Sequence, residues 1–118
     1  MSRALASALA LTVLLALAMA VATLMPVAPG PGLPGSDKAH HLLGFAVLAL
    51  PVAVVRPRAM LWLAPVLAAY GGAIELVQPA VGRGRELADW VADLAGIGLG
   101  TLVGLVTRRV GWRRSGQT

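Results

Sequence analysis

The chain has no cysteine and little charge of either sign. Without cysteine, its 118 residues can form no disulfide and can offer no thiol as a nucleophile or metal ligand. Only 13% of the residues are charged, against about 25% in soluble domains, and 58% are hydrophobic. So few charges could not cover a water-facing surface. The composition therefore argues against an ordinary soluble domain and predicts an integral membrane protein with a single domain, residues 1–118.

Several functional classes lack their sequence signatures. The chain contains no Walker motif, no dinucleotide-binding fingerprint and no internal repeat, which argues against an autonomous energy-coupled pump. The net charge of +5 comes from arginines near the ends of apolar stretches, not from a basic stripe with interleaved aromatic residues. Membrane topology and anionic lipids account for arginines in such places, so we expect membrane lipids and no nucleic acid as partners.

Four apolar stretches are long enough to cross a bilayer, which takes about 20 helical residues. We predict an all-α bundle of four transmembrane helices with approximate bounds 5–24, 39–55, 59–78 and 87–106. The first stretch follows Arg3, as the apolar region of a signal peptide would. It is longer than the roughly 7–15 residues of that region, which favours an uncleaved anchor over cleavage.

Lysine and arginine are divided unevenly between the two faces of this bundle. If the N-terminus is cytoplasmic, the outer loops hold Lys38, Arg83 and Arg85, and the inner regions hold Arg3, Arg56, Arg58, Arg108, Arg109, Arg113 and Arg114. This bias predicts that both termini are cytoplasmic (N-in/C-in). The start of the second stretch, the end of the third and the start of the fourth then meet on the outer face.

The carboxylates of the chain lie at or near the ends of the apolar stretches that meet there. Ionisable groups in or beside a bilayer are costly, so their placement is a hypothesis about function. The candidate ligand-binding residues are Asp37, Lys38, His41, Glu75, Gln78, Arg83, Asp89 and Asp93.

On the fourth stretch, two of these acids share a helix face with small residues. Asp89 and Asp93 fall on one stripe with Gly96, Gly100 and Gly104. Glycines at this spacing let another helix approach closely. Because the glycines should face the bundle, we expect both aspartates to face inward with them.

The same residues resemble the motifs of a known family, the VanZ-like membrane proteins. Asp37, Lys38, His41 and Phe45 are similar to its D-K-x-x-H-x-x-x-F signature, Glu75 and Gln78 to its E-x-x-Q, and Arg83 and Asp89 to its R…D element. The resemblance runs from about residue 36 to residue 104 and includes Gly96 and Gly100. It departs at Asp93, where many members carry asparagine.

The resemblance implies a multi-pass protein of the bacterial cytoplasmic membrane with a polar site on the extracytoplasmic side. The family is named for a protein that raises resistance to teicoplanin, a glycopeptide antibiotic, and most members have no known activity. Possible ligands are therefore an envelope lipid, a lipid-linked cell-wall precursor or a glycopeptide. The sequence leaves open whether the chain acts alone, as a homo-oligomer or in a larger membrane complex, and whether resistance is involved.

The residues themselves support three functional readings. In the first, which we favour, Arg83 pairs with phosphate or carboxylate and Lys38 adds a point charge, so the site recognises an anionic ligand. In the second, His41 is a general base, with Glu75 and Asp89 as further catalytic candidates. In the third, the ion pairs only hold the helices together, as in a structural or transporter subunit.

Metal binding is the weaker form of the catalytic reading. The histidines and carboxylates of the cluster are suitable ligands for zinc or manganese. However, the chain has no H-x-x-x-H or H-E-x-x-H spacing, and the adjacent His40 and His41 point about 100° apart on a helix. From the sequence we therefore predict neither a metal nor another cofactor.

Overall fold

A computed structural model describes residues 1–25, 36–82 and 86–116, with the backbone alone for residues 36 and 37. These parts form α1 (Arg3–Leu24), α2 (Ser36–Val55), α3 (Met60–Val77) and α4 (Leu87–Ser115), with short 3₁₀ turns η1 (Pro57–Ala59) and η2 (Gln78–Val81) flanking α3. Each of the four α-helical regions is long and apolar enough to cross a membrane. The predicted all-α class and the four potential spans are confirmed.

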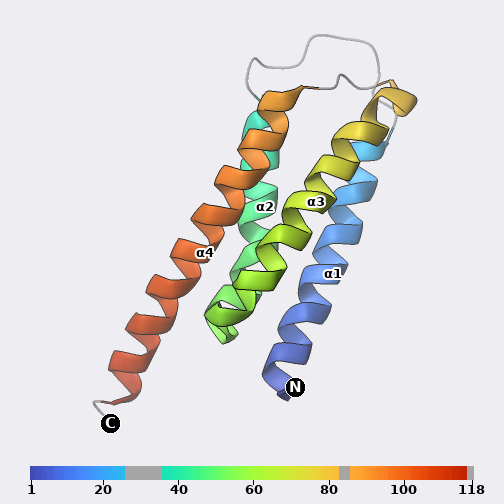
Figure 1. Cartoon of the computed structure of the whole chain (residues 1–118). Helices are drawn as coiled ribbons and strands as arrows, with labels where there is room; N and C mark the ends of the chain where they lie inside the picture. The colour runs from blue at the N-terminus through green and yellow to red at the C-terminus, as the bar shows by residue number, and fades with distance from the viewer. Residues whose placement is uncertain (26–35, 83–85, 117–118) are drawn as a thin grey trace.

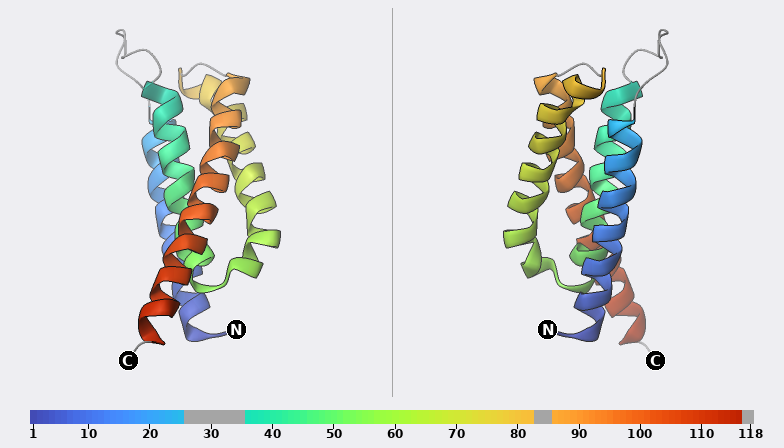
Figure 2. Two further views of the ribbon diagram at one scale, coloured as in Figure 1. Left: turned by 90° about the vertical axis from the view of Figure 1, so that its left-hand side faces the viewer. Right: turned by 90° about the vertical axis from the view of Figure 1, so that its right-hand side faces the viewer.

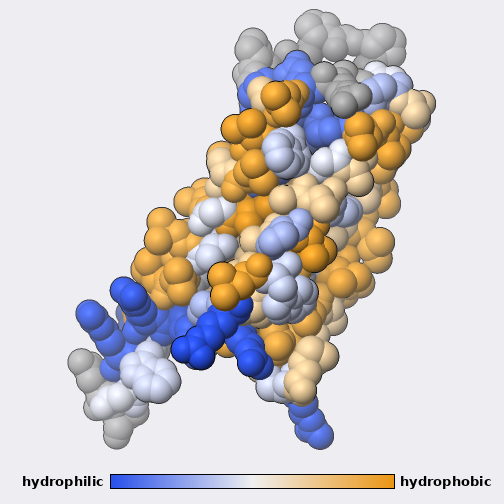
Figure 3. Space-filling model, in the orientation of Figure 1, coloured by the Kyte–Doolittle hydropathy of each residue, from blue (hydrophilic) through white to orange (hydrophobic). Residues whose placement is uncertain are grey.

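The four helices run alternately up and down along the long axis of the molecule (Figure 1). Both termini lie at one end, and the start of α2, the end of α3 and the start of α4 lie at the other (Figures 1 and 2). On the face shown in Figure 3, hydrophobic residues cover most of the length of the bundle and hydrophilic residues gather at its two ends. The fold therefore brings the three segments that carry the predicted site to the same end.

Helices α2 and α4 pack most closely against each other, because glycines on α4 leave room for the backbone of α2. A Cβ atom added to Gly96 would lie 2.3 Å from the carbonyl oxygen of Leu42, and one added to Gly100 would lie 2.2 Å from that of Ala46. No side chain fits at either position, so the two backbones are in direct contact. The predicted stripe is confirmed, because Asp89, Asp93, Gly96, Gly100 and Gly104 are all buried.

The helices α1 and α3 pack around this pair through apolar side chains and a few polar contacts. Phe45, Leu48 and Val52 of α2 are almost fully buried at the centre of the core. The Thr12 hydroxyl of α1 donates to the carbonyl oxygen of Leu48 at 3.0 Å. A hydroxyl that bonds to backbone in this way satisfies its polar group inside an apolar bundle.

Helix α4 extends beyond residue 106, the predicted end of its apolar stretch, to Ser115. The guanidinium of Arg108 donates to the carbonyl oxygens of Val54 and Val55, at 3.0 and 2.7 Å. These are carbonyls of the last turn of α2, which have no partner within their own helix. The basic end of α4 therefore caps α2, in addition to any interaction it makes with lipid.

Candidate functional site

The candidate site lies within the bundle at the end opposite the termini. Its buried members are His41 from α2, Glu75 from α3, and Asp89 and Asp93 from α4. Each is at most 5% exposed, and Asp93 is fully buried. Four ionisable side chains from three helices are therefore held together away from solvent.

The shortest contact in the site joins His41 to Asp93. The Nδ1 atom of His41 lies 2.6 Å from Oδ1 of Asp93, the distance of a strong, charge-assisted hydrogen bond. The other carboxylate oxygen, Oδ2, packs against Gly71 of α3, where an added Cβ atom would lie 2.6 Å away. Within the described ranges Oδ2 has no hydrogen-bond partner. Asp93 therefore fixes the orientation of the His41 ring, and Gly71 makes room for Asp93.

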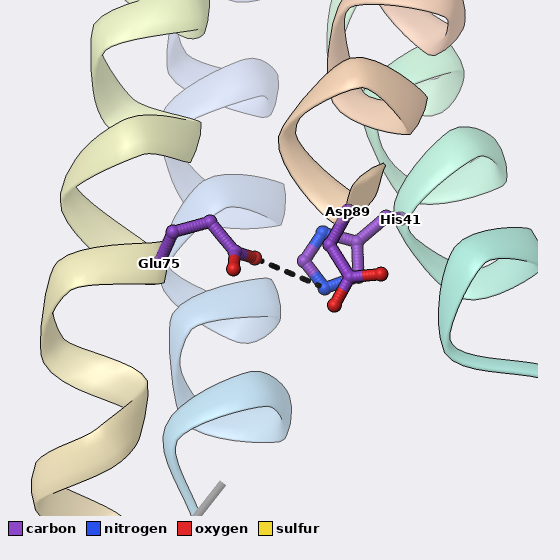
Figure 4. A group of neighbouring side chains, drawn as sticks. All are labelled: His41, Glu75 and Asp89. Atoms are coloured by element: carbon purple, nitrogen blue, oxygen red, sulfur yellow. Dashed lines mark ion pairs between the residues drawn. The ribbon is translucent and has the colours of Figure 1, made fainter. Parts of the chain in front are cut away.

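The other ring nitrogen of His41 faces Glu75. His41 Nε2 and Glu75 Oε1 are 3.8 Å apart, which is too long for a hydrogen bond. Glu75 Oε1 is buried and has no hydrogen-bond partner among the described residues, whereas Oε2 accepts from the backbone N–H of Glu86 at 3.3 Å. The Asp89 carboxylate projects into the same space (Figure 4). One potential ligand atom from each of His41, Glu75 and Asp89 lies within 4.8 Å of the others.

An ion pair lies on the exposed side of this cluster. The Lys38 ammonium is 2.8 Å from Oε2 of Glu86 and 3.8 Å from Oδ1 of Asp89. The side chains of Lys38 and Glu86 are about half exposed, at 48% and 58%. The ammonium lowers the pKa of the Glu86 carboxyl, mainly through their hydrogen bond. Lys38 thus connects the start of α2 to the start of α4.

Glu86 was not among the predicted site residues, because an acid in a short loop reads as a solvated charge. The structure instead gives it two contacts, one from its side chain to Lys38 and one from its backbone to Glu75. Its position just before the fourth apolar stretch, at the same end as Lys38, is the signal that could have identified it. Gly71, one turn before Glu75 on α3, also belongs to the site, because its lack of a side chain leaves room for Asp93.

Five of the eight predicted residues come together in the structure: Lys38, His41, Glu75, Asp89 and Asp93. Gln78 is buried in η2, and no described residue hydrogen-bonds to its Oε1. The side chain of Asp37 and the whole of Arg83 lie outside the described residues. His40, which the sequence did not favour as a ligand, is exposed.

The described part of the site is acidic. It contains the carboxylates of Glu75, Glu86, Asp89 and Asp93 against one lysine and one histidine. Buried charge of one sign is costly without a partner of the other sign. The interior of the cluster is therefore chemically suited to a cation or a proton, and direct anion binding would need a further positive group.

An apolar groove of about 480 Å³ adjoins the site between α3 and α4. It is lined by Ala69, Gly72, Ala73, Glu75, Leu76, Glu86, Leu87 and Trp90. The Trp90 indole donates to the carbonyl oxygen of Ala68 at 3.0 Å and so ties the two helices together there. Further toward the termini, where α3 and α4 diverge (Figure 2), a second apolar groove of about 670 Å³ runs between them.

Comparison with known proteins gave no match: no family model, no curated protein and no solved structure is significantly similar to this chain.

Proposed function

We propose that the chain is a VanZ-like membrane protein that binds an envelope lipid or a lipid-linked cell-wall precursor at the polar end of its bundle. In this proposal the termini are cytoplasmic and the polar end faces the outer leaflet of a bacterial inner membrane. The ligand's acyl chain lies between α3 and α4, and its headgroup reaches the polar cluster.

The observation that carries the proposal is the groove between α3 and α4. Its walls are apolar, from Ala69 to Leu76 on one side and Leu87 to Trp90 on the other, but Glu75 and Glu86 lie at its polar end. Such a shape fits an amphipathic molecule better than a small water-soluble one, since pockets bind through apolar walls and a few placed polar groups.

The distribution of arginines supports the proposed orientation. The seven arginines assigned to the inner face belong to segments at the end of the bundle that carries the termini: Arg3, Arg56, Arg58, Arg108, Arg109, Arg113 and Arg114. An excess of positive charge marks the cytoplasmic side of a membrane protein. The polar cluster lies at the opposite end and would therefore face outward.

The charge of the cluster restricts how a headgroup can bind. Envelope lipids carry phosphate, and the described side chains are mainly acidic. Lys38 is the nearest described cation, and it already pairs with Glu86 and Asp89. Phosphate recognition in this proposal therefore depends on Lys38 together with Arg83, one of the two arginines that the sequence places between Gln78 and Asp89.

The test compares two phenylalanine substitutions on exposed positions of α3. Ala73 lines the groove, whereas Val66 does not line it, and both side chains are exposed. Native mass spectrometry of the detergent-purified full chain should detect a retained lipid in the native protein and in Val66→Phe, and no retained lipid in Ala73→Phe. The mass of the adduct would distinguish a phospholipid from a lipid-linked precursor.

The two variants should have the same unfolding midpoint, because neither change touches the core. Equal retention of lipid by the two variants, or no adduct on the native protein, would overturn the proposal.

A further inference from the structure

We propose that His41, Glu75 and Asp89 form a binding site for a first-row divalent metal ion of the zinc type, with Asp93 as the residue that positions His41. This inference does not depend on lipid binding. It rests on the geometry of buried side chains from three helices. These residues are far apart in the sequence, so their spacing along the chain could not predict this geometry.

The His41 ring is bound at Nδ1, which lies 2.6 Å from Oδ1 of Asp93. An ionised Asp93 can only accept in this bond, so Nδ1 then carries the hydrogen. In the neutral ring, Nε2 then holds a lone pair and no hydrogen. A carboxylate that fixes one ring nitrogen and leaves the other as ligand is the usual second layer of a histidine–metal site.

The ring nitrogen Nε2 faces Glu75. Glu75 Oε1 lies 3.8 Å away, is buried, and has no hydrogen-bond donor within the described part of the chain. With a neutral His41 ring, two electron-pair donors face one another in a dry space, which is unfavourable unless a positive group lies between them. If Nε2 carried a hydrogen instead, the distance would still be too long for a hydrogen bond. A metal ion between the two atoms would satisfy both.

The ligand set also fits a metal ion in size and composition. The ligand atoms of His41, Glu75 and Asp89 lie within 4.8 Å of one another. Ligands about 2.1 Å from a tetrahedral ion are about 3.4 Å apart, so side-chain rotations that bring the ligand atoms closer by up to about 1.4 Å would complete the set. One imidazole and two carboxylates suit zinc, cobalt or manganese better than magnesium or calcium, which prefer oxygen ligands alone.

The charges around the site agree with a bound cation. Glu75 and Asp89 would supply two negative charges to a divalent ion, and Asp93 would carry a third behind the imidazole. Lys38 lies beside Asp89 at 3.8 Å, but its closer partner is Glu86, at 2.8 Å on the exposed side. Three protein ligands leave a position for water or another oxygen, as in zinc sites that bind a further ligand.

The test uses Co²⁺ and Zn²⁺ as probes on the full chain, purified in detergent and stripped of metal with a chelator. The native protein should bind one Co²⁺ ion per chain, with a visible d–d absorption spectrum, and Zn²⁺ should abolish the spectrum by displacement. Equal concentrations of Mg²⁺ or Ca²⁺ should not displace Co²⁺. No stoichiometric binding of Co²⁺ or Zn²⁺ by the native protein would overturn the proposal, and an ion pair between a protonated His41 and Glu75 would then account for their approach.

Two histidine variants provide the matched comparison. His41→Ala should abolish the Co²⁺ spectrum, whereas His40→Ala, which changes the adjacent and exposed histidine, should keep it. If His41→Ala does not fold, Glu75→Gln tests the assignment in its place. This variant keeps the shape of the side chain and should remove tight binding of Co²⁺. A folded His41→Ala or Glu75→Gln variant with native affinity would refute the assignment.

Asp93→Asn tests the positioning role. Loss of a second-layer carboxylate typically weakens metal affinity about 10–100-fold. We expect Asp93→Asn to bind one Co²⁺ ion per chain with an affinity lowered by this factor and with a shifted absorption spectrum. Substitution of a residue that only fills space would not shift the spectrum. Unchanged affinity and spectrum would refute a role of Asp93 in orienting the metal-bound ring. Lipid retention by the metal-free protein, measured in parallel, separates failure of this site from failure of lipid binding.

Discussion

Substitution of Gly96 by alanine should loosen the α2–α4 contact and with it the candidate site. The added Cβ atom would lie 2.3 Å from the carbonyl oxygen of Leu42 and 3.0 Å from Cβ of Phe45. Ordinary contact begins at about 3.4 Å, so the first distance is about 1.1 Å too short. A backbone oxygen inside a helix cannot move alone, and α4 must therefore shift away from α2 by about this amount.

The structure also sets the expected magnitude. Overpacking of this kind typically costs about 1–3 kcal/mol in the free energy of unfolding. Gly98 on the same helix provides the control, because a Cβ atom added there meets nothing within 4 Å. Both substitutions change helix propensity equally, so the difference in stability between Gly96→Ala and Gly98→Ala isolates the packing cost.

The same shift should act on the polar cluster. Gly96 lies one turn from Asp93, and Leu42 follows His41, so separation of the helices would lengthen the 2.6 Å contact between His41 and Asp93. Reversible unfolding in mixed micelles of a mild detergent and SDS, followed by circular dichroism, would measure the stabilities. Equal free energies of unfolding for the two variants would show that α2 and α4 are not in backbone contact at Gly96.

Three further predictions concern single contacts. Pairing with Lys38 lowers the pKa of Glu86, so the pairing stabilises the folded state fully above the ordinary pKa of 4.5, and this stabilisation is lost as the pH falls through the lowered pKa. Lys38→Met should remove this part of the pH dependence of the free energy of unfolding. An unchanged pH profile in that variant would contradict the pairing. Arg108→Ala should lower the free energy of unfolding by about 0.5–1.5 kcal/mol through its lost bonds to the end of α2, and an equal loss in Arg109→Ala would argue against capping. Tyr70→Phe, which removes a hydrogen bond to α1, should cost about 0.6 kcal/mol in the same assay, and a cost of several kcal/mol would contradict that estimate.

Much of the fold could be predicted from the sequence because its signals are local. The length of each apolar stretch predicts a span, and the spacing of Gly96, Gly100 and Gly104 predicts which face of the last helix is buried. The end of α4 could not be predicted in the same way. Its apolar pattern stops near residue 106, but the helix continues through basic residues to Ser115, and the bond from Arg108 to α2 joins residues 54 positions apart.

The site could be predicted only in part because its decisive contacts join residues distant in sequence. The pairing of His41 with Asp93 spans 52 positions, and that of Lys38 with Glu86 spans 48. The sequence could bring these residues to one end of the bundle, since topology depends on the number of spans. It could not reveal which carboxylate lies nearest the histidine, because that depends on helix rotation and on the space that Gly71 leaves for Asp93.

Because of the glycine contacts between α2 and α4, the members of the polar cluster are held in place in two different ways. His41, Asp89 and Asp93 belong to α2 and α4, whose backbones are in contact. Their relative positions are therefore fixed, because neither helix can shift along the other without a steric clash. Glu75 belongs to α3, which diverges from α4 toward the other end of the bundle. The distance between Glu75 and the other three is set instead by side-chain contacts of α3, namely the bond from the Trp90 indole to Ala68 and the packing of Asp93 against Gly71. Loss of the Trp90 bond would therefore displace Glu75 first, while the backbone contact of α2 with α4 keeps the other three in place.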